Sequence, residues 1–178
     1  MKRVCHGLLL VLVLLVHGGE PLPGRIEVLL GDQFFQLEVA ADPQTRQKGL
    51  MDRELLPFEQ GMLFVFPAPE ELVFWMCRTR ISLDILFLDA DGVVVDIQTM
   101  PAEPPRRFRE TEADYENRQP RYKSRQPAQF AIELSRQPAQ FAIELNAGTA
   151  AAVGVKVGDR IPLDLPALRL LVAKEQDE

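Results

Sequence analysis

Short runs of alternating apolar and polar residues, separated by turn signals, constrain the fold of this 178-residue chain more than any other feature. Residues 25–40 carry this pattern on both sides of a Gly-Asp pair at 31–32, and residues 83–100 carry it on both sides of an Asp-Gly pair at 91–92. Such pairs between two apolar-polar runs indicate β-hairpins. We therefore predict a mostly β single domain over residues 25–165, folded as a compact sandwich or a barrel.

Two short helices are expected between the strands. Asp42 is suited to cap a helix that begins at Pro43, because an aspartate oxygen accepts from free backbone amides and proline needs no donor in the first turn. Gly49 is placed to end or bend this helix. Asn146 is the expected cap of the second helix, over residues 147–153.

An 11-residue segment is written twice, since residues 124–134 recur without change as residues 135–145. A β-domain has one slot for such a strand, and the second copy joins directly to the Asn146 cap. We predict that the second copy occupies the sheet and that the first copy is surplus. A long exposed loop is expected over residues 101–123, which carry several prolines and many charges, and residues 166–178 are expected to form a C-terminal tail.

The amino-terminal residues have the layout of a secretory signal peptide. Lys2 and Arg3 precede an apolar run over residues 8–16, and small residues follow it. This run is far shorter than the ~20 residues that span a bilayer, so we expect cleavage of residues 1–19 and no stable membrane anchor afterwards. The domain is then expected in the periplasm or outside the cell.

Cleavage would remove both histidines, His6 and His17. The remaining chain would lack the imidazole of a Ser-His or Cys-His pair and of histidine-dependent metal sites. Cys77 would be the one cysteine left, which excludes an intramolecular disulfide. The net charge of -6 disfavours nucleic acid and anionic membranes as partners, because both are bound through basic surfaces.

The most distinctive fragments of the sequence are spread over residues 46–89. They read R-Q-K-G-L-M at 46–51, G-M-L-F-V-F at 61–66, F-W-M at 74–76, a lone Thr79, and L-D-I-L-F-L-D at 83–89. Together with N-A-G at 146–148 and V-G-D at 157–159, this series resembles the domain-of-unknown-function family 192, over roughly residues 26–165. The resemblance implies a β-rich domain that is often exported. It implies no reaction and no ligand, because none is assigned to that family.

Asp84 is the leading candidate for a functional polar side chain. It lies in a predicted strand with two apolar faces, so its carboxylate must be paired or protonated, and Arg46, Arg78 and Arg80 are candidate partners. One hypothesis makes Asp84 and Glu144 the two carboxylates of a hydrolase. We favour the alternative, a structural aspartate at a strand end that holds backbone amides or an arginine.

A non-catalytic binding module is the function that we favour from the sequence. Its ligand would be a small molecule, a glycan or an envelope partner, held by the turn at residues 75–79 and by the loop at residues 101–123. The ligand-binding candidates are Arg46, Trp75, Thr79, Asp84 and Tyr122. Packing between two layers is the alternative role for the single tryptophan.

Three methionines and one cysteine supply a further hypothesis. Thioethers and a thiolate bind copper(I), and the candidate ligands are Met51, Met62, Met76 and Cys77. Each methionine stands beside leucine, tryptophan or phenylalanine, which is typical of a packed core. We therefore expect no metal and no cofactor, and keep the copper(I) site as an alternative.

Overall fold

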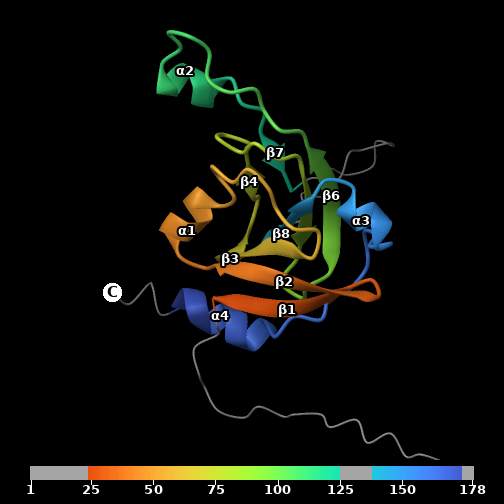
Figure 1. The fold of residues 1–178 in the computed structure, drawn as a ribbon. Coiled ribbons are helices and arrows are strands. Elements are labelled where there is room, and N and C mark those ends of the chain that lie inside the picture. The colour runs from red at the N-terminus through yellow and green to blue at the C-terminus, as the bar shows by residue number, and fades with distance from the viewer. Residues whose placement is uncertain (1–23, 125–137, 174–178) are drawn as a thin grey trace, which may run out of the picture.

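A six-stranded sheet forms the centre of the computed structural model, which describes residues 24–124 and 138–173 (Figure 1). The strand order is β1-β2-β3-β8-β5-β6, and only β2 and β3 pair in parallel. The strands of this sheet are β1 (Arg25–Leu30), β2 (Gln33–Ala40), β3 (Gln60–Glu70), β8 (Ala139–Asn146), β5 (Leu83–Leu88) and β6 (Val94–Met100). The mostly β class is confirmed, but the sheet is open at β1 and β6 and does not close into a barrel.

Both predicted hairpins are present. β1 pairs with β2 from Leu30 and Gln33 outwards, and β5 pairs with β6. Gly31 and Gly92 have φ angles of 62° and 74°, a region that glycine enters without steric cost. A Cβ atom on Gly31 would meet the Val153 carbonyl oxygen at 2.0 Å, so this turn has no room for a side chain.

Both faces of the sheet are buried at its central strands, and every residue of β5 is buried. One face packs against α3 (Thr149–Ala152) and α4 (Leu165–Ala173), through residues such as Ala150 and Leu168. The other face packs against the segment that follows α1 (Pro43–Lys48). It also packs against residues near a small two-stranded sheet, which is formed by β4 (Val73–Phe74) and β7 (Tyr122–Lys123). Figure 1 shows α4 beneath β1, and α1 with β4 and β7 on the opposite side. Short elements therefore cover the sheet where a sandwich would have a second extended sheet.

The two predicted helix caps have different outcomes. The Asp42 carboxylate accepts a hydrogen bond from the Thr45 amide at 2.7 Å, and Gly49 follows the last turn of α1, as predicted. Asn146 does not cap α3, which begins after Gly148. Its side-chain amide instead donates to the carbonyl oxygens of Leu56 at 2.8 Å and Pro57 at 3.2 Å. Asn146 therefore ties the end of β8 to the segment before β3.

Regular structure is present in the expected loop and in the expected C-terminal tail. α2 (Glu112–Asn117) and β7 lie within residues 101–123, and Tyr115 of α2 is buried with its hydroxyl accepting from the Arg78 amide at 3.2 Å. α4 lies within the expected tail and contributes Leu168 and Val172 to the core. No helix within residues 24–124 and 138–173 is long and apolar enough to cross a bilayer.

Residues of the second copy of the repeat form β8, between β3 and β5. Ser124, the first residue of the first copy, follows β7, where it exchanges two hydrogen bonds with the backbone of Leu72. The rest of the first copy lies outside the described residues. The predicted signal peptide at residues 1–19 lies outside them as well.

The repeat offers a matched pair of substitutions that tests which copy occupies the sheet. Phe141 is fully buried in β8, and Phe130 has the same neighbours along the chain in the first copy. We expect Phe141→Ala to lower the free energy of unfolding by about 3–5 kcal/mol, and Phe130→Ala to change it little. Urea unfolding followed by circular dichroism measures both, and equal losses would contradict the assignment.

Candidate functional site

Asp84 is buried and its carboxylate oxygens both accept hydrogen bonds from the protein. Thr99 Oγ1 donates to Oδ1 at 2.8 Å, and the Ala150 amide donates to Oδ2 at 3.1 Å. Ala150 lies in the first turn of α3, where backbone amides lack partners within the helix. Asp84 therefore holds the start of α3 against the sheet, which is the structural role that we favoured from the sequence.

The three arginines proposed as partners of Asp84 have other partners. Arg46 donates to the carbonyl oxygens of Ala41 and Val65, and its guanidinium lies 5.2 Å from the centre of the Phe66 ring. Arg78 pairs with Asp52, and Arg80 contacts Glu54 at 3.4 Å. The expected pairing of Asp84 with a guanidinium is therefore wrong, because backbone and hydroxyl donors already satisfy this carboxylate.

Asp84 and Glu144 lie on opposite faces of the sheet. Asp84 is the Cα partner of Leu145, whereas Glu144 is the partner of Ile85. Partners across antiparallel strands point to the same face, and neighbours along a strand point to opposite faces. Asp84 thus faces the core under α3, and Glu144 faces the side of α1. The two carboxyl groups cannot flank one substrate, so the structure does not assemble the predicted hydrolase pair.

Glu144 lines a cavity of about 250 Å³ between the sheet and α1. Its side chain is 5% exposed, and no group in the described parts of the chain forms a hydrogen bond with its carboxyl group. Burial raises the pKa of Glu144 to about 8, an effect that the positive charge of Arg53 reduces only in part. Glu144 is therefore mostly protonated at neutral pH, and its carboxyl group can both donate and accept a hydrogen bond.

Aromatic side chains form much of the cavity wall. Phe74 contacts Phe64 edge-to-face with ring centres 5.0 Å apart, and it contacts Phe66 at 6.3 Å. Trp75 also lines the cavity, and the guanidinium of Arg121 covers its ring at 4.4 Å from the ring centre. The stacked arginine and the edge-to-face pairs fix the orientation of these rings. The cavity thus combines aromatic walls with a few polar groups.

Three of the five predicted ligand-binding residues line this cavity: Arg46, Trp75 and Thr79. The other two do not. Asp84 is on the opposite face of the sheet, and Tyr122 pairs with Phe74 across β7 and β4 and packs into the core beside it. Glu144, which the sequence suggested only as a catalytic group, lines the same cavity as Arg46, Trp75 and Thr79.

An ion pair next to Glu144 was missed from the sequence. Arg53 donates to both carboxylate oxygens of Glu38, at 3.0 and 2.6 Å, and Arg25 contacts the same carboxylate. These arginines hold the pKa of Glu38 below its ordinary value. Glu38 is the Cα partner of Met62, which is itself the partner of Glu144. Only the parallel register of β2 and β3 places this pair beside the cavity, and local sequence patterns carry no signal of that register.

Residues 26–163 match the model of the DUF192 family, which is described as an uncharacterized ACR. The chain belongs to this family. A search of curated proteins found no match.

Two solved structures are similar to this DUF192 chain. One, from Sinorhizobium meliloti 1021 and described as a "putative transcription regulator", is 30% identical with a TM-score of 0.56, over 77% of this chain and 90% of its own. The other is a protein of unknown function from Novosphingobium aromaticivorans DSM 12444, 29% identical with a TM-score of 0.54, over 78% of this chain and 84% of its own. Both likenesses extend over most of the fold.

The four candidate copper(I) ligands of this DUF192 chain divide between the core and two neighbouring pockets, and Met51 and Cys77 line one of these pockets together. Met62 and Met76 are buried in the core on the α1 side of the sheet, where methionine is an ordinary packing residue. Met51 lines the cavity with Glu144. Cys77 is buried, and its sulfur lies near two glutamates that the sequence hypothesis did not include, Glu112 and Glu116.

Substitutions at Asp84 test its structural role, which is independent of the cavity lined by Glu144. Asp84→Ala leaves the Ala150 amide and the Thr99 hydroxyl without their acceptor, and we expect the free energy of unfolding to fall by about 2–4 kcal/mol. Asp84→Asn keeps one acceptor oxygen and should lose less. Urea unfolding measures both losses. Equal stability of Asp84→Ala and the parent protein would contradict the capping role.

The pKa of Glu144 predicts a dependence of stability on pH. Between the ordinary carboxyl pKa of 4.5 and about 8, the folded protein keeps a proton that the unfolded chain has lost. The parent protein should therefore lose stability relative to Glu144→Gln as pH rises through this window, by up to about 4 kcal/mol. Unfolding curves at pH 5 to 9 measure the difference, with Glu70→Gln as an exposed control. Parallel curves for Glu144→Gln and the parent would contradict a raised pKa.

Proposed function

We propose that this DUF192 protein is a non-catalytic binding module whose cavity takes a small, uncharged molecule with an apolar face and hydroxyl or carbonyl groups. One observation carries this proposal: the buried carboxyl group of Glu144 lines a cavity and has no partner within the described residues. The neutral carboxyl group can donate and accept a hydrogen bond, and the described residues use neither capacity. A ligand in the cavity would supply the missing partner.

The shape and lining of the cavity support a small ligand. Ligand sites are concave and mostly apolar, with a few polar groups that fix orientation. Here Trp75 and the phenylalanines supply the apolar wall, and Glu144, Thr79 and Arg46 supply the polar groups. A volume of about 250 Å³ lies below the ~300–1,000 Å³ that is common for drug-sized ligands, so a molecule the size of a monosaccharide or smaller is favoured.

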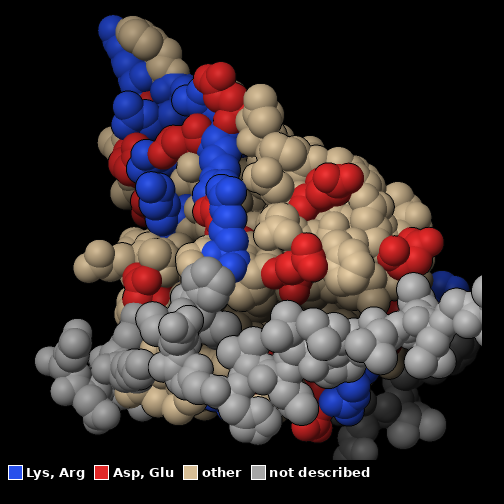
Figure 2. Space-filling model, turned by 60° about the horizontal axis from the view of Figure 1, so that its bottom comes forward, with Lys and Arg blue, Asp and Glu red and all other residues tan. Residues whose placement is uncertain are grey.

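A nucleic-acid ligand is disfavoured by the distribution of charge. Figure 2 shows basic side chains gathered towards one end of the molecule, with acidic side chains among them. Arg118 and Glu110, for example, form an ion pair at 2.6 Å in the 101–123 region. Nucleic-acid binding requires a surface of unpaired positive charge. Basic side chains that are paired with acidic ones do not provide such a surface. The description of the Sinorhizobium neighbour therefore does not guide this proposal.

Trp75 offers a direct measurement because it is the one tryptophan of the chain and lines the cavity. We expect a panel of neutral monosaccharides and small alcohols to contain compounds that change the Trp75 fluorescence and raise the melting temperature. A compound present at ~100 times its dissociation constant should stabilise the fold by about 2.7 kcal/mol.

Two variants decide whether such binding uses the cavity. Glu144→Leu removes the hydrogen-bonding group from the wall at similar volume, and Glu70→Leu is the matched control on exposed β3 sequence. Binding should weaken at least tenfold in Glu144→Leu and stay unchanged in Glu70→Leu. No response to the whole panel, or equal binding by both variants, would overturn the proposed function.

A further inference from the structure

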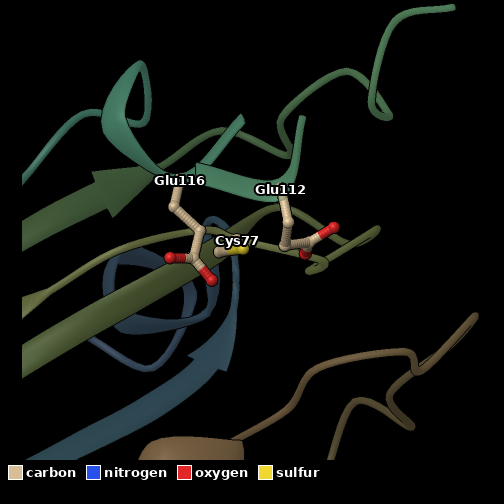
Figure 3. A group of neighbouring side chains, drawn as sticks. All are labelled: Cys77, Glu112 and Glu116. Atoms are coloured by element: carbon tan, nitrogen blue, oxygen red, sulfur yellow. The ribbon is translucent and has the colours of Figure 1, made fainter. Parts of the chain in front are cut away.

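Cys77, Glu112 and Glu116 form a cluster of metal-ligating side chains outside the cavity of Glu144. The Cys77 sulfur and one carboxylate oxygen from each glutamate lie within 4.8 Å of one another. Figure 3 shows both glutamates extending from α2 towards the turn that carries Cys77, one on either side of the sulfur. Cys77 is 35 or more positions from both glutamates in the sequence, so the fold brings the sulfur and the carboxylates together.

The cluster is positioned by a buried tyrosine. Glu112 and Glu116 are four residues apart, a spacing that places two side chains on the same face of a helix. Tyr115 of α2 is buried, and its hydroxyl accepts a hydrogen bond from the Arg78 amide, in the turn after Cys77, at 3.2 Å. The guanidinium of Arg118 covers the Tyr115 ring at 4.8 Å from its centre. The contacts of Tyr115 thus hold α2 over Cys77 without the help of a metal ion.

The thiol of Cys77 has no hydrogen-bond partner within the described parts of the chain, although the residue is only 2% exposed. This sulfur therefore lies beside two carboxylates without a hydrogen bond of its own. A bound cation would attract all three groups and deprotonate the thiol.

The same three residues border an open pocket of about 350 Å³, which leaves room for an ion and its remaining water ligands. The described side chains around the three ligand atoms compete only weakly with a metal ion. Glu112 contacts Arg106 at 3.3 Å, but both side chains are about half exposed, and ion pairs of this kind contribute little to stability. Glu112 is therefore free to exchange Arg106 for a metal.

We propose that Cys77, Glu112 and Glu116 bind a divalent transition-metal ion, with Zn²⁺ as the best match, and leave a fourth position to water or a ligand. Zinc accepts thiolate and carboxylate ligands together, at about 2.3 and 2.0–2.2 Å. Calcium and magnesium favour oxygen ligands alone, and copper(I) favours softer ligands than two carboxylates. This proposal does not depend on a ligand in the cavity of Glu144.

Tetrahedral coordination requires ligand atoms about 3.5 Å apart at these bond lengths. The ligand atoms now lie within 4.8 Å of one another, so small side-chain movements bring them to this spacing when the ion binds. Side-chain rotation of the two glutamates can supply this movement, since Glu112 is exposed and Glu116 is partly exposed. Cys77 can stay in place on its buried turn.

Metal titration of the reduced, metal-free protein tests the proposal. We expect one Zn²⁺ per chain in competition with a chromophoric chelator, and a thiolate-to-metal charge-transfer band when Co²⁺ replaces Zn²⁺. Cys77→Ser should abolish this band, and the double variant Glu112→Gln/Glu116→Gln should weaken Zn²⁺ binding at least tenfold. Glu103→Gln, on the same segment but outside the cluster, is the matched control and should bind as the parent does.

Each outcome of the titration either supports or overturns the site. The glutamate variants keep the test decisive if Cys77→Ser fails to fold, because their side chains lie at the surface of α2. Absence of one-to-one binding at micromolar Zn²⁺, a cobalt spectrum without the thiolate band, or equal affinity of the double variant and Glu103→Gln would each overturn it. Binding of a monosaccharide at Trp75 is measured separately, so the two proposals can fail independently.

Discussion

Burial of the central strands on both faces is the constraint on which the rest of this structure depends. β5 and β8 lie between other strands and are covered above and below, so a polar side chain on either strand must find a partner or remain uncharged. The two acids of these strands meet this requirement differently. Asp84 accepts from a hydroxyl and a helix amide, whereas burial keeps Glu144 protonated. The same constraint thus produces one structural acid and one acid with unused hydrogen-bonding capacity.

The covering elements on the α1 side are joined by contacts between segments far apart in the chain. Tyr115 holds α2 to the turn of Arg78, and Arg121 covers Trp75. Both contacts come from residues 101–123, which also supply β7 beside β4. The region that carries Glu112 and Glu116 is therefore attached next to the cavity of Glu144, and the two candidate sites share Trp75 and Met51 as neighbours.

The sequence predicted local features well and relations between distant segments poorly. Glycine at positions 31 and 92 and the cap at Asp42 identified the hairpins and α1, because these signals act within a few residues. Alternation around Asp84 indicated its burial, but not that β8 would place Glu144 on the other face. The parallel pairing of β2 with β3 and the approach of α2 to Cys77 depend on long-range packing. Single-sequence patterns carry little information about either.

The two copies of the repeat offer the same side chains to the same place in the sheet, so side-chain chemistry cannot choose between them. What differs is the chain that follows. The second copy leads at once to Asn146, whose amide holds the carbonyl oxygens of Leu56 and Pro57, and then to α3, whose first turn Asp84 holds. Strand selection in this domain therefore decides where the spare residues fall: with the second copy in the sheet they lengthen the connection between β7 and β8, and the connection to the downstream anchors stays short.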